Sequence, residues 1–186
     1  MRAIPFLLFV LAACGGDDGG SAGSAGTDQM PPQGRVAVDG WLRDGAYKLW
    51  AAEPAIHEAR DPSPHGFNRI YSNALLASNA AGTATWPKGV AAVKELYNSM
   101  TDTTPVGYAV YAKLQDDSAD GVNWYWYERV PANNEAPHDA HGVVADGDGT
   151  DGPPNEICVG CHMGAGIDMN HTPSPGGRDF VYTPVR

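Results

Sequence analysis

The stretch VAAVKELY, residues 90–97, reads as a β-strand with a charge on each of its two faces. Alternate side chains of an extended strand point to opposite faces, so Lys94 falls on one face and Glu95 on the other. At least one of these charges must therefore face inward if either face packs. Two further runs, rich in aromatic and β-branched residues, follow at 106–114 and 122–130. Their short connections predict neighbouring antiparallel strands in a meander.

Shorter elements are predicted on either side of this sheet. A strand is expected over 67–72, with a short helix after it, and another strand over 178–183. A helix is expected over 39–50, with Asp39 as its N-cap. These elements predict a β-rich α+β fold, with an antiparallel sheet and a few short helices.

A C-x-x-C-H motif lies near the C-terminus, at Cys158, Cys161 and His162. Thiols three residues apart on a helix share one face, so both can reach the vinyl groups on one edge of a haem while the imidazole binds the iron. Asn155 is expected to cap this short helix. The alternatives are a redox-active cysteine pair, a zinc half-site or a chance match. We favour a single haem c packed by the sheet, because the N-terminus suggests export.

Residues 1–13 have the order of a secretion signal, with an early cation followed by an apolar run that ends in small residues. The run is too short to span a bilayer. Its end resembles a bacterial lipobox, in which signal removal exposes a cysteine that carries lipid, here Cys14; the alternative is ordinary cleavage elsewhere. The expected location is the bacterial cell envelope, facing the periplasm and held by lipid alone. Gly15 after the cysteine favours the outer membrane.

This assignment uses all three cysteines of the chain and leaves none for a disulfide. Residues 14–34 are mostly Gly, Ser, Ala, Asp and Pro, and predict a flexible tether. Residues 35–186 suit one haem domain. The formal net charge of -10 argues against nucleic acid as a partner, since phosphates would be repelled.

Other polar segments predict no second site. The Asp- and Gly-rich run at 146–152 superficially suggests calcium, but the bidentate glutamate and sixth-position glycine of a calcium loop are out of register. We expect a solvated loop, as part of a long irregular segment over 131–156. His65 follows a proline-broken loop, and nothing in its spacing requires a metal site.

Several segments, taken in order, resemble the cytochrome P-460 family. They are FNRIY at 67–71, WPKG at 86–89, VKELY at 93–97, GYAV at 107–110, NWYWY at 123–127, the motif at 158–162 and DFVYT at 179–183. Only the haem motif is specific by itself, and the resemblance covers about Gly40 to the C-terminus. It implies a β-rich monohaem fold, a possible homodimer, and oxidation of hydroxylamine or handling of nitric oxide.

The resemblance also implies that Lys94 is covalently bonded to a meso carbon of the haem. A related branch, the β-sheet cytochromes c′, has the fold without the cross-link and binds nitric oxide. An inward ammonium is costly unless it is paired or neutralised, and bonding its nitrogen to a porphyrin carbon removes the charge. The alternatives are a Lys94 paired with a carboxylate, or one that points to solvent while Glu95 lies inside.

The activity expected from this resemblance needs an open haem coordination site opposite His162, with electrons leaving to a redox partner cytochrome. Asp116 and Asp117 are the candidate acceptors of protons from a small nitrogenous substrate. The competing functions are a non-catalytic protein that binds nitric oxide or a similar gas, and a simple electron carrier. The carrier would need a sixth ligand, either a histidine or one of Met100, Met163 and Met169.

Overall fold

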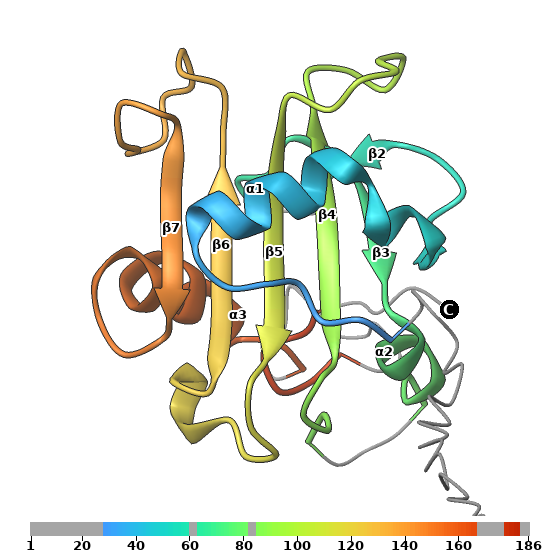
Figure 1. The fold of residues 1–186 in the computed structure, drawn as a ribbon, viewed down its shortest axis with the longest axis vertical. Coiled ribbons are helices and arrows are strands. Elements are labelled where there is room, and N and C mark those ends of the chain that lie inside the picture. The colour runs from blue at the N-terminus through green and yellow to red at the C-terminus, as the bar shows by residue number, and fades with distance from the viewer. Residues whose placement is uncertain (1–27, 60–62, 82–84, 167–176, 183–186) are drawn as a thin grey trace, which may run out of the picture.

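A seven-stranded antiparallel sheet forms the centre of the protein, seen face-on in Figure 1. The computed structural model describes residues 28–59, 63–81, 85–166 and 177–182. The long strands are β3 (Phe67–Ser72), β4 (Ala91–Tyr97), β5 (Gly107–Lys113), β6 (Trp124–Arg129) and β7 (Val143–Asp148). Each pairs with the next along the chain, which confirms the predicted meander. Two short strands, β1 (Ala51–Ala52) and β2 (His57–Glu58), both pair with β3.

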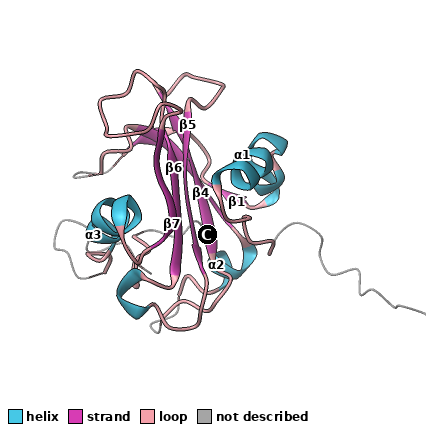
Figure 2. Ribbon diagram, turned by 60° about the vertical axis from the view of Figure 1, so that its left-hand side comes forward, coloured by secondary structure: helices cyan, strands magenta, loops and turns pink. Residues whose placement is uncertain are grey.

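Short helices cover the two faces of the sheet. Figure 2 shows the sheet nearly edge-on, with α1 (Arg35–Asp44) on one side and α3 (Gly160–His162) on the other. The remaining helices are η1 (Ala46–Leu49), α2 (Ala74–Ser78), η2 (Ala119–Gly121) and η3 (Pro154–Val159). The predicted β-rich α+β fold is therefore confirmed.

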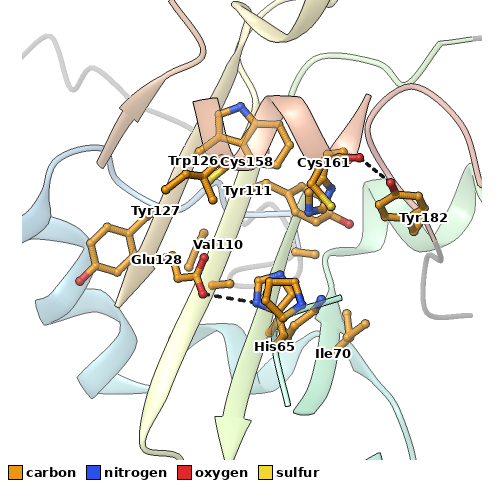
Figure 3. Close-up of a pocket in the computed structure, with 16 residues that line it drawn as sticks. His65, Ile70, Val110, Tyr111, Trp126, Tyr127, Glu128, Cys158, Cys161 and Tyr182 are labelled. Carbon is orange, nitrogen blue, oxygen red and sulfur yellow. Dashed lines mark hydrogen bonds and ion pairs between the residues drawn. The ribbon is translucent and has the colours of Figure 1, made fainter. Parts of the chain in front are cut away.

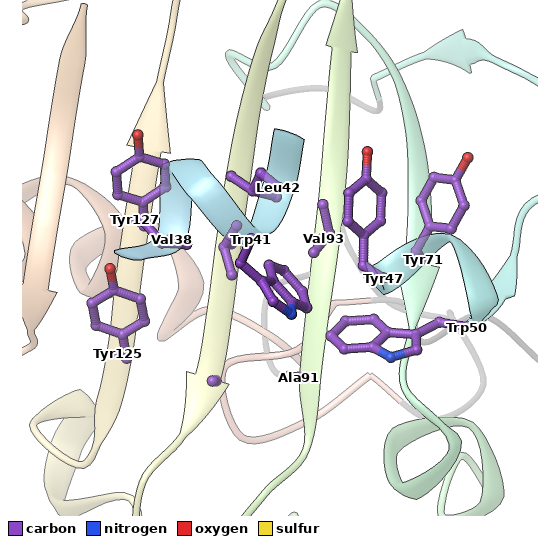
Figure 4. Packing of buried hydrophobic residues seen from close by; sticks show 12 residues of the cluster. Val38, Trp41, Leu42, Tyr47, Trp50, Tyr71, Ala91, Val93, Tyr125 and Tyr127 are labelled. Carbon is purple, nitrogen blue, oxygen red and sulfur yellow. The ribbon is translucent and has the colours of Figure 1, made fainter. Parts of the chain in front are cut away.

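The face under α1 is a closed aromatic core (Figure 4). Helix α1 supplies Val38, Trp41 and Leu42, whose spacing places them on one side of the helix. They pack in a cluster with side chains from the strands, including Tyr71, Val93, Tyr125 and Tyr127. Side chains of the helix and the strands thus close this face of the sheet.

The predicted helix over 39–50 is wrong in its bounds. It starts at Arg35 and stops at Asp44, because Gly45 takes a left-handed conformation with φ +73° and donates its N–H to Leu42. Asp39 is consequently inside the helix and does not cap it. Its carboxylate accepts a hydrogen bond of 2.6 Å from the Tyr127 hydroxyl, a partner on β6.

The segment over 131–156 is not wholly irregular, because it contains β7. Asp146 lies in that strand and accepts a hydrogen bond of 2.8 Å from the Tyr125 hydroxyl. A Cβ on Gly149 would lie 2.1 Å from the carbonyl oxygen of Gly121, so this glycine permits close packing of two backbones. The described residues contain no group of three or more His, Cys, Asp or Glu side chains placed to hold a metal ion.

At the C-terminal end, residues 177–182 form a tight turn with an isolated bridge between Arg178 and Val181, where a longer strand was expected. At the other end, the predicted secretion signal, Cys14 and the tether up to residue 27 lie outside the described residues. Within the part of the chain that is described, no helix is both long and apolar enough to cross a bilayer.

Candidate functional site

An open pocket lies on the face of the sheet opposite α1, between the strands and the helical segment η3–α3 (Figure 3). It encloses about 770 Å³, including the solvent at its mouth, and its lining is mainly apolar. The sheet contributes residues of β3 to β6, and the helical segment contributes all three residues of the C-x-x-C-H motif. The motif and the central sheet therefore share one cavity.

Two rows of side chains cross the sheet beneath this pocket. In one row Lys94 pairs with Ala109 of β5, and Ala109 pairs with Glu128 of β6. The small alanine leaves space between the two charged side chains, which sit two strands, or about 10 Å, apart in the backbone. In the neighbouring row Tyr111 pairs with Trp126. The register thus places a cation and a carboxylate on an otherwise apolar wall.

The motif spans two turns of different width. Cys158 lies in η3, which has the wide π-type turn that is often found at functional sites, and Cys161 and His162 follow in α3. Asn155 is inside the helix and does not cap it; its side-chain amide donates to the Gly149 carbonyl at 2.7 Å. Both motif cysteines are free thiols, half-buried for Cys158 and exposed for Cys161. Burial raises the pKa of Cys158 to about 12, so its sulfur remains protonated.

His162 is held by a backbone carbonyl and by aromatic rings. Its Nδ1 lies 2.7 Å from the carbonyl oxygen of Phe180. A carbonyl can only accept, so Nδ1 carries the proton and Nε2 is the nitrogen with the lone pair. The ring centroids of Trp126 and Tyr182 lie 4.9 and 5.4 Å from that of the imidazole. This is the tautomer and the kind of support that a metal-binding histidine has.

Lys94 is half-buried and lines the same pocket. Burial lowers its pKa to about 8, against the opposing effect of the nearby Glu128, Glu53 and Cys161. None of the ion pairs among the described residues involves Lys94. Near pH 8 the Lys94 amine is therefore neutral in an appreciable share of the protein molecules, and a neutral amine can act as a nucleophile.

Glu95, the next residue, lies on the opposite face. It is 1% exposed and accepts hydrogen bonds from the hydroxyls of Tyr47 and Tyr97. Both charges of the strand are thus inside the protein, one in the pocket and one in the closed core.

Two further residues line the pocket: His65, for which the sequence predicted no site, and Glu128, which no sequence pattern indicated. His65 Nδ1 lies 3.4 Å from Glu128 Oε1, drawn as a dashed line in Figure 3. The imidazole and the carboxylate are not oriented for a hydrogen bond. His65 Nδ1 is therefore a buried polar atom without a hydrogen-bond partner. Burial and the nearby Lys94 lower the pKa of His65, while Glu128 opposes this. The strand alternation placed Glu128 on the face of Trp126, but only the register brings it level with Lys94.

The two aspartates expected to accept protons are elsewhere. Asp116 and Asp117 are exposed in the turn after β5 and are not among the described residues that line the pocket. Asp116 accepts from the Lys88 backbone N–H at 3.2 Å, and Asp117 accepts from the Asn123 amide at 2.7 Å. The Asp117 carboxylate bonds within the connection from β5 to β6, and the Asp116 carboxylate joins that connection to the loop before β4.

The methionines considered as a sixth ligand are not brought to the pocket either. Met100 and Met163 are 62% and 60% exposed, and neither lines the pocket. Met169 lies outside the described residues.

A scan of the chain against protein-family models finds no match, and a search of curated proteins finds no similar sequence. Fold and site together define a β-rich protein in which a C-x-x-C-H helix faces an apolar pocket on an antiparallel sheet.

Proposed function

We propose that the pocket holds one haem c, attached through Cys158 and Cys161 with His162 as axial ligand, in an enzyme of cytochrome P-460 type. The reaction proposed is oxidation of hydroxylamine or a related nitrogen compound. The observation that carries the proposal is that Lys94, from β4, lines the same pocket as the C-x-x-C-H helix. A passive haem carrier has no need of a lysine there.

The residues present suit such a group. The apolar walls match the faces of a porphyrin, and each thiol can add its S–H across a vinyl C=C bond to give a thioether. The Nδ1 proton of His162 is already used by the Phe180 carbonyl, which leaves Nε2 as the nitrogen able to bind a metal. The bound haem would supply an iron centre that takes electrons from the substrate and passes them to a redox partner.

Glu128 is the carboxylate we propose as the acceptor of substrate protons, in place of Asp116 and Asp117. It lines the pocket, whereas the two aspartates are engaged in the turn after β5. His65, 3.4 Å from Glu128, would pass the proton outward. Proton transfer between the carboxylate and the imidazole would need the two groups to move into hydrogen-bond alignment, from the 3.4 Å contact that they make on the wall that also carries Lys94.

Lys94 is proposed to be bonded to the edge of the haem. The bond replaces one N–H and one C–H by N–C, so two protons and two electrons leave, the electrons to an added oxidant such as peroxide. The nitrogen then carries no full charge, which removes the cost of a half-buried ammonium with no ion-pair partner among the described residues.

Mass spectrometry of haem peptides tests this bond. In the native protein, the peptide with Lys94 should be joined to the peptide with Cys158 and Cys161 through the haem, with two hydrogen atoms fewer than the sum of its parts. Lys94→Arg should abolish the joined product, whereas Lys88→Arg, at an exposed lysine nearby, should keep it. A native Lys94 peptide that is unmodified would contradict the cross-link.

Activity is tested by adding hydroxylamine to the oxidised protein together with an electron acceptor. Turnover supports the proposed enzyme. Haem that binds nitric oxide but gives no turnover would favour the gas-binding alternative, and protein without covalent haem in a pyridine haemochrome assay would contradict all haem functions.

A second candidate, a simple electron carrier, is favoured by one observation. His65 lines the same pocket as His162 and is a potential sixth ligand. This function predicts a six-coordinate ferrous spectrum that does not change with nitric oxide, and conversion to a gas-binding form by His65→Ala. A five-coordinate ferrous haem in the unaltered protein would contradict it.

Export, the lipid anchor at Cys14 and the homodimer remain part of the proposal. Labelling cells with a radioactive fatty acid, with Cys14→Ser as control, tests the anchor. Sedimentation of the haem-loaded protein tests the dimer.

A further inference from the structure

The C-terminal turn has a strained backbone. Arg178 and Val181 exchange two backbone hydrogen bonds of 2.9 Å, and the two residues between them, Asp179 and Phe180, have φ of +45° and +68°. Both central residues of a type I′ turn need positive φ, which is why Asn and Gly are the usual choice. A bulky side chain such as that of Phe180 is unfavourable in this region. The surroundings must hold the turn in place.

Buried polar contacts provide that hold. The Asp179 carboxylate accepts from Lys113 Nζ at 2.7 Å, from the Trp86 backbone N–H at 2.9 Å and from the Ser118 hydroxyl. Lys113 is 0% exposed, and this carboxylate is its only ion-pair partner among the described residues. Breaking a buried charge pair by removing one partner is strongly unfavourable. We name Asp179, Lys113 and Ser118 the Asp179 latch.

The latch fixes the carbonyl group that contacts the proposed iron ligand. The next residue after Asp179 is Phe180, whose carbonyl oxygen lies 2.7 Å from His162 Nδ1. The Phe180 ring packs against Trp124 and Trp126, with centroids 6.1 and 6.4 Å away. The carboxylate and the ring therefore hold the strained peptide from two sides.

We propose that Asp179 is a positioning residue for His162: through the latch it fixes the Phe180 carbonyl that sets the tautomer, orientation and basicity of the imidazole. This inference rests on the proposed haem site, but not on any particular reaction there. A stronger hydrogen bond at Nδ1 makes the imidazole a better electron donor, which stabilises ferric over ferrous iron. Loosening the latch should therefore raise the haem reduction potential.

The test compares haem-loaded variants by potentiometric titration and by resonance Raman spectroscopy of the ferrous iron–histidine stretch. Asp179→Asn should lower the ratio of oxidised to reduced haem at a fixed potential by about tenfold, or about 59 mV for a one-electron couple. The iron–histidine frequency should fall with it. Asp120→Asn, an exposed aspartate that also has positive φ, is the matched control and should change neither quantity.

Two further variants keep the test decisive if Asp179→Asn does not fold. Lys113→Met combined with Asp179→Asn removes both buried charges, which is tolerated better than leaving one unpaired. Ser118→Ala removes one donor to the latch and should shift both quantities in the same direction by less.

Folded variants with unchanged potential and unchanged iron–histidine frequency would overturn the inference, even if urea unfolds them more easily, because that result assigns the latch to stability alone. A shift in both quantities without hydroxylamine turnover would reject the proposed reaction and uphold the latch. Absence of haem from the unaltered protein would reject both.

Discussion

At the scale of single residues, Lys94 and Glu95 show how one strand serves two environments. Glu95 is a buried carboxylate that receives two tyrosine hydroxyls and lies 3.5 Å from Lys48 Nζ, so its charge is compensated within the closed core. Lys94 forms none of the ion pairs among the described residues, and burial lowers its pKa to about 8 although the nearby Glu128 opposes this. The charged residue without a direct ion pair is the one in the pocket, which is the reason to assign it a chemical role.

Glu128 should be the proton acceptor of the reaction. We expect Glu128→Gln to lower kcat/KM for hydroxylamine by about 10²–10⁴-fold, the usual contribution of a general base. Steady-state reduction of an electron acceptor measures this, and the exposed Glu135→Gln is the control. A larger loss in Asp116→Asn or Asp117→Asn than in Glu128→Gln would restore the assignment made from sequence.

At the scale of elements, Glu95 of β4 is the hydrogen-bond acceptor for two buried tyrosine hydroxyls. Glu95→Ala leaves Tyr47 and Tyr97 without their acceptor, and we expect the free energy of unfolding to fall by about 2–4 kcal/mol. Urea unfolding measures the change. Glu58→Ala, on an exposed position of β2, should stay within about 0.5 kcal/mol of the parent. Equal effects of the two substitutions would show that the tyrosines find other partners.

The contact between η2 and the chain after β7 depends on glycine. In Gly149→Ala the new Cβ would meet the Gly121 carbonyl oxygen at 2.1 Å and a Val159 methyl at 2.8 Å, so we expect a loss of about 1–3 kcal/mol in unfolding free energy. Gly40→Ala in α1 meets only an arginine nitrogen at 3.6 Å and should stabilise by up to about 1 kcal/mol. Thermal unfolding measures both variants: the Tm should fall in Gly149→Ala and rise in Gly40→Ala.

Element prediction succeeded where a local pattern was sufficient. The strands expected over 67–72, 90–97, 106–114 and 122–130 are β3, β4, β5 and β6, because alternation and turn residues are local signals. The sequence did not decide which rings of β6 face the core: Tyr125 and Tyr127 join it, and Trp126 lines the pocket. Element prediction failed at Asp39, which resembled a helix cap but bonds to Tyr127, and in 131–156, where β7 is too polar to be recognised by its composition. In both cases a partner distant in the sequence determined the outcome.

At the scale of the whole molecule, one sheet separates a closed face rich in tyrosine from an open face with the pocket (Figures 3 and 4). The pKa values of several tyrosines, on both faces, are raised. Burial is the main cause of each shift. Hydrogen bonds to carboxylates raise the pKa further at Tyr47, Tyr97, Tyr125 and Tyr127. Tyr111, which lines the pocket, is shifted mainly by burial. The stability of the protein at alkaline pH should therefore depend on the ionisation of these tyrosines.

Stability should fall as the pH rises past about 10. These tyrosines ionise near 10 in the unfolded chain but stay protonated in the folded one, so above that pH the unfolded state binds fewer protons and is favoured. Urea midpoints from about pH 8 to about pH 11, with tyrosinate absorbance followed in parallel, measure the effect. Full tyrosinate formation near pH 10 in protein that is still folded would contradict it.

The sequence by itself determined the antiparallel meander, which residues of a strand share a face and the C-x-x-C-H motif, because strand alternation and motif spacing are properties of consecutive residues. Only the tertiary structure decided which residues meet. Strand register put Glu128 level with Lys94, a loop brought His65 to Glu128, and the C-terminal turn brought the Phe180 carbonyl to His162. Those contacts depend on pairing and packing between distant segments, which no local pattern encodes.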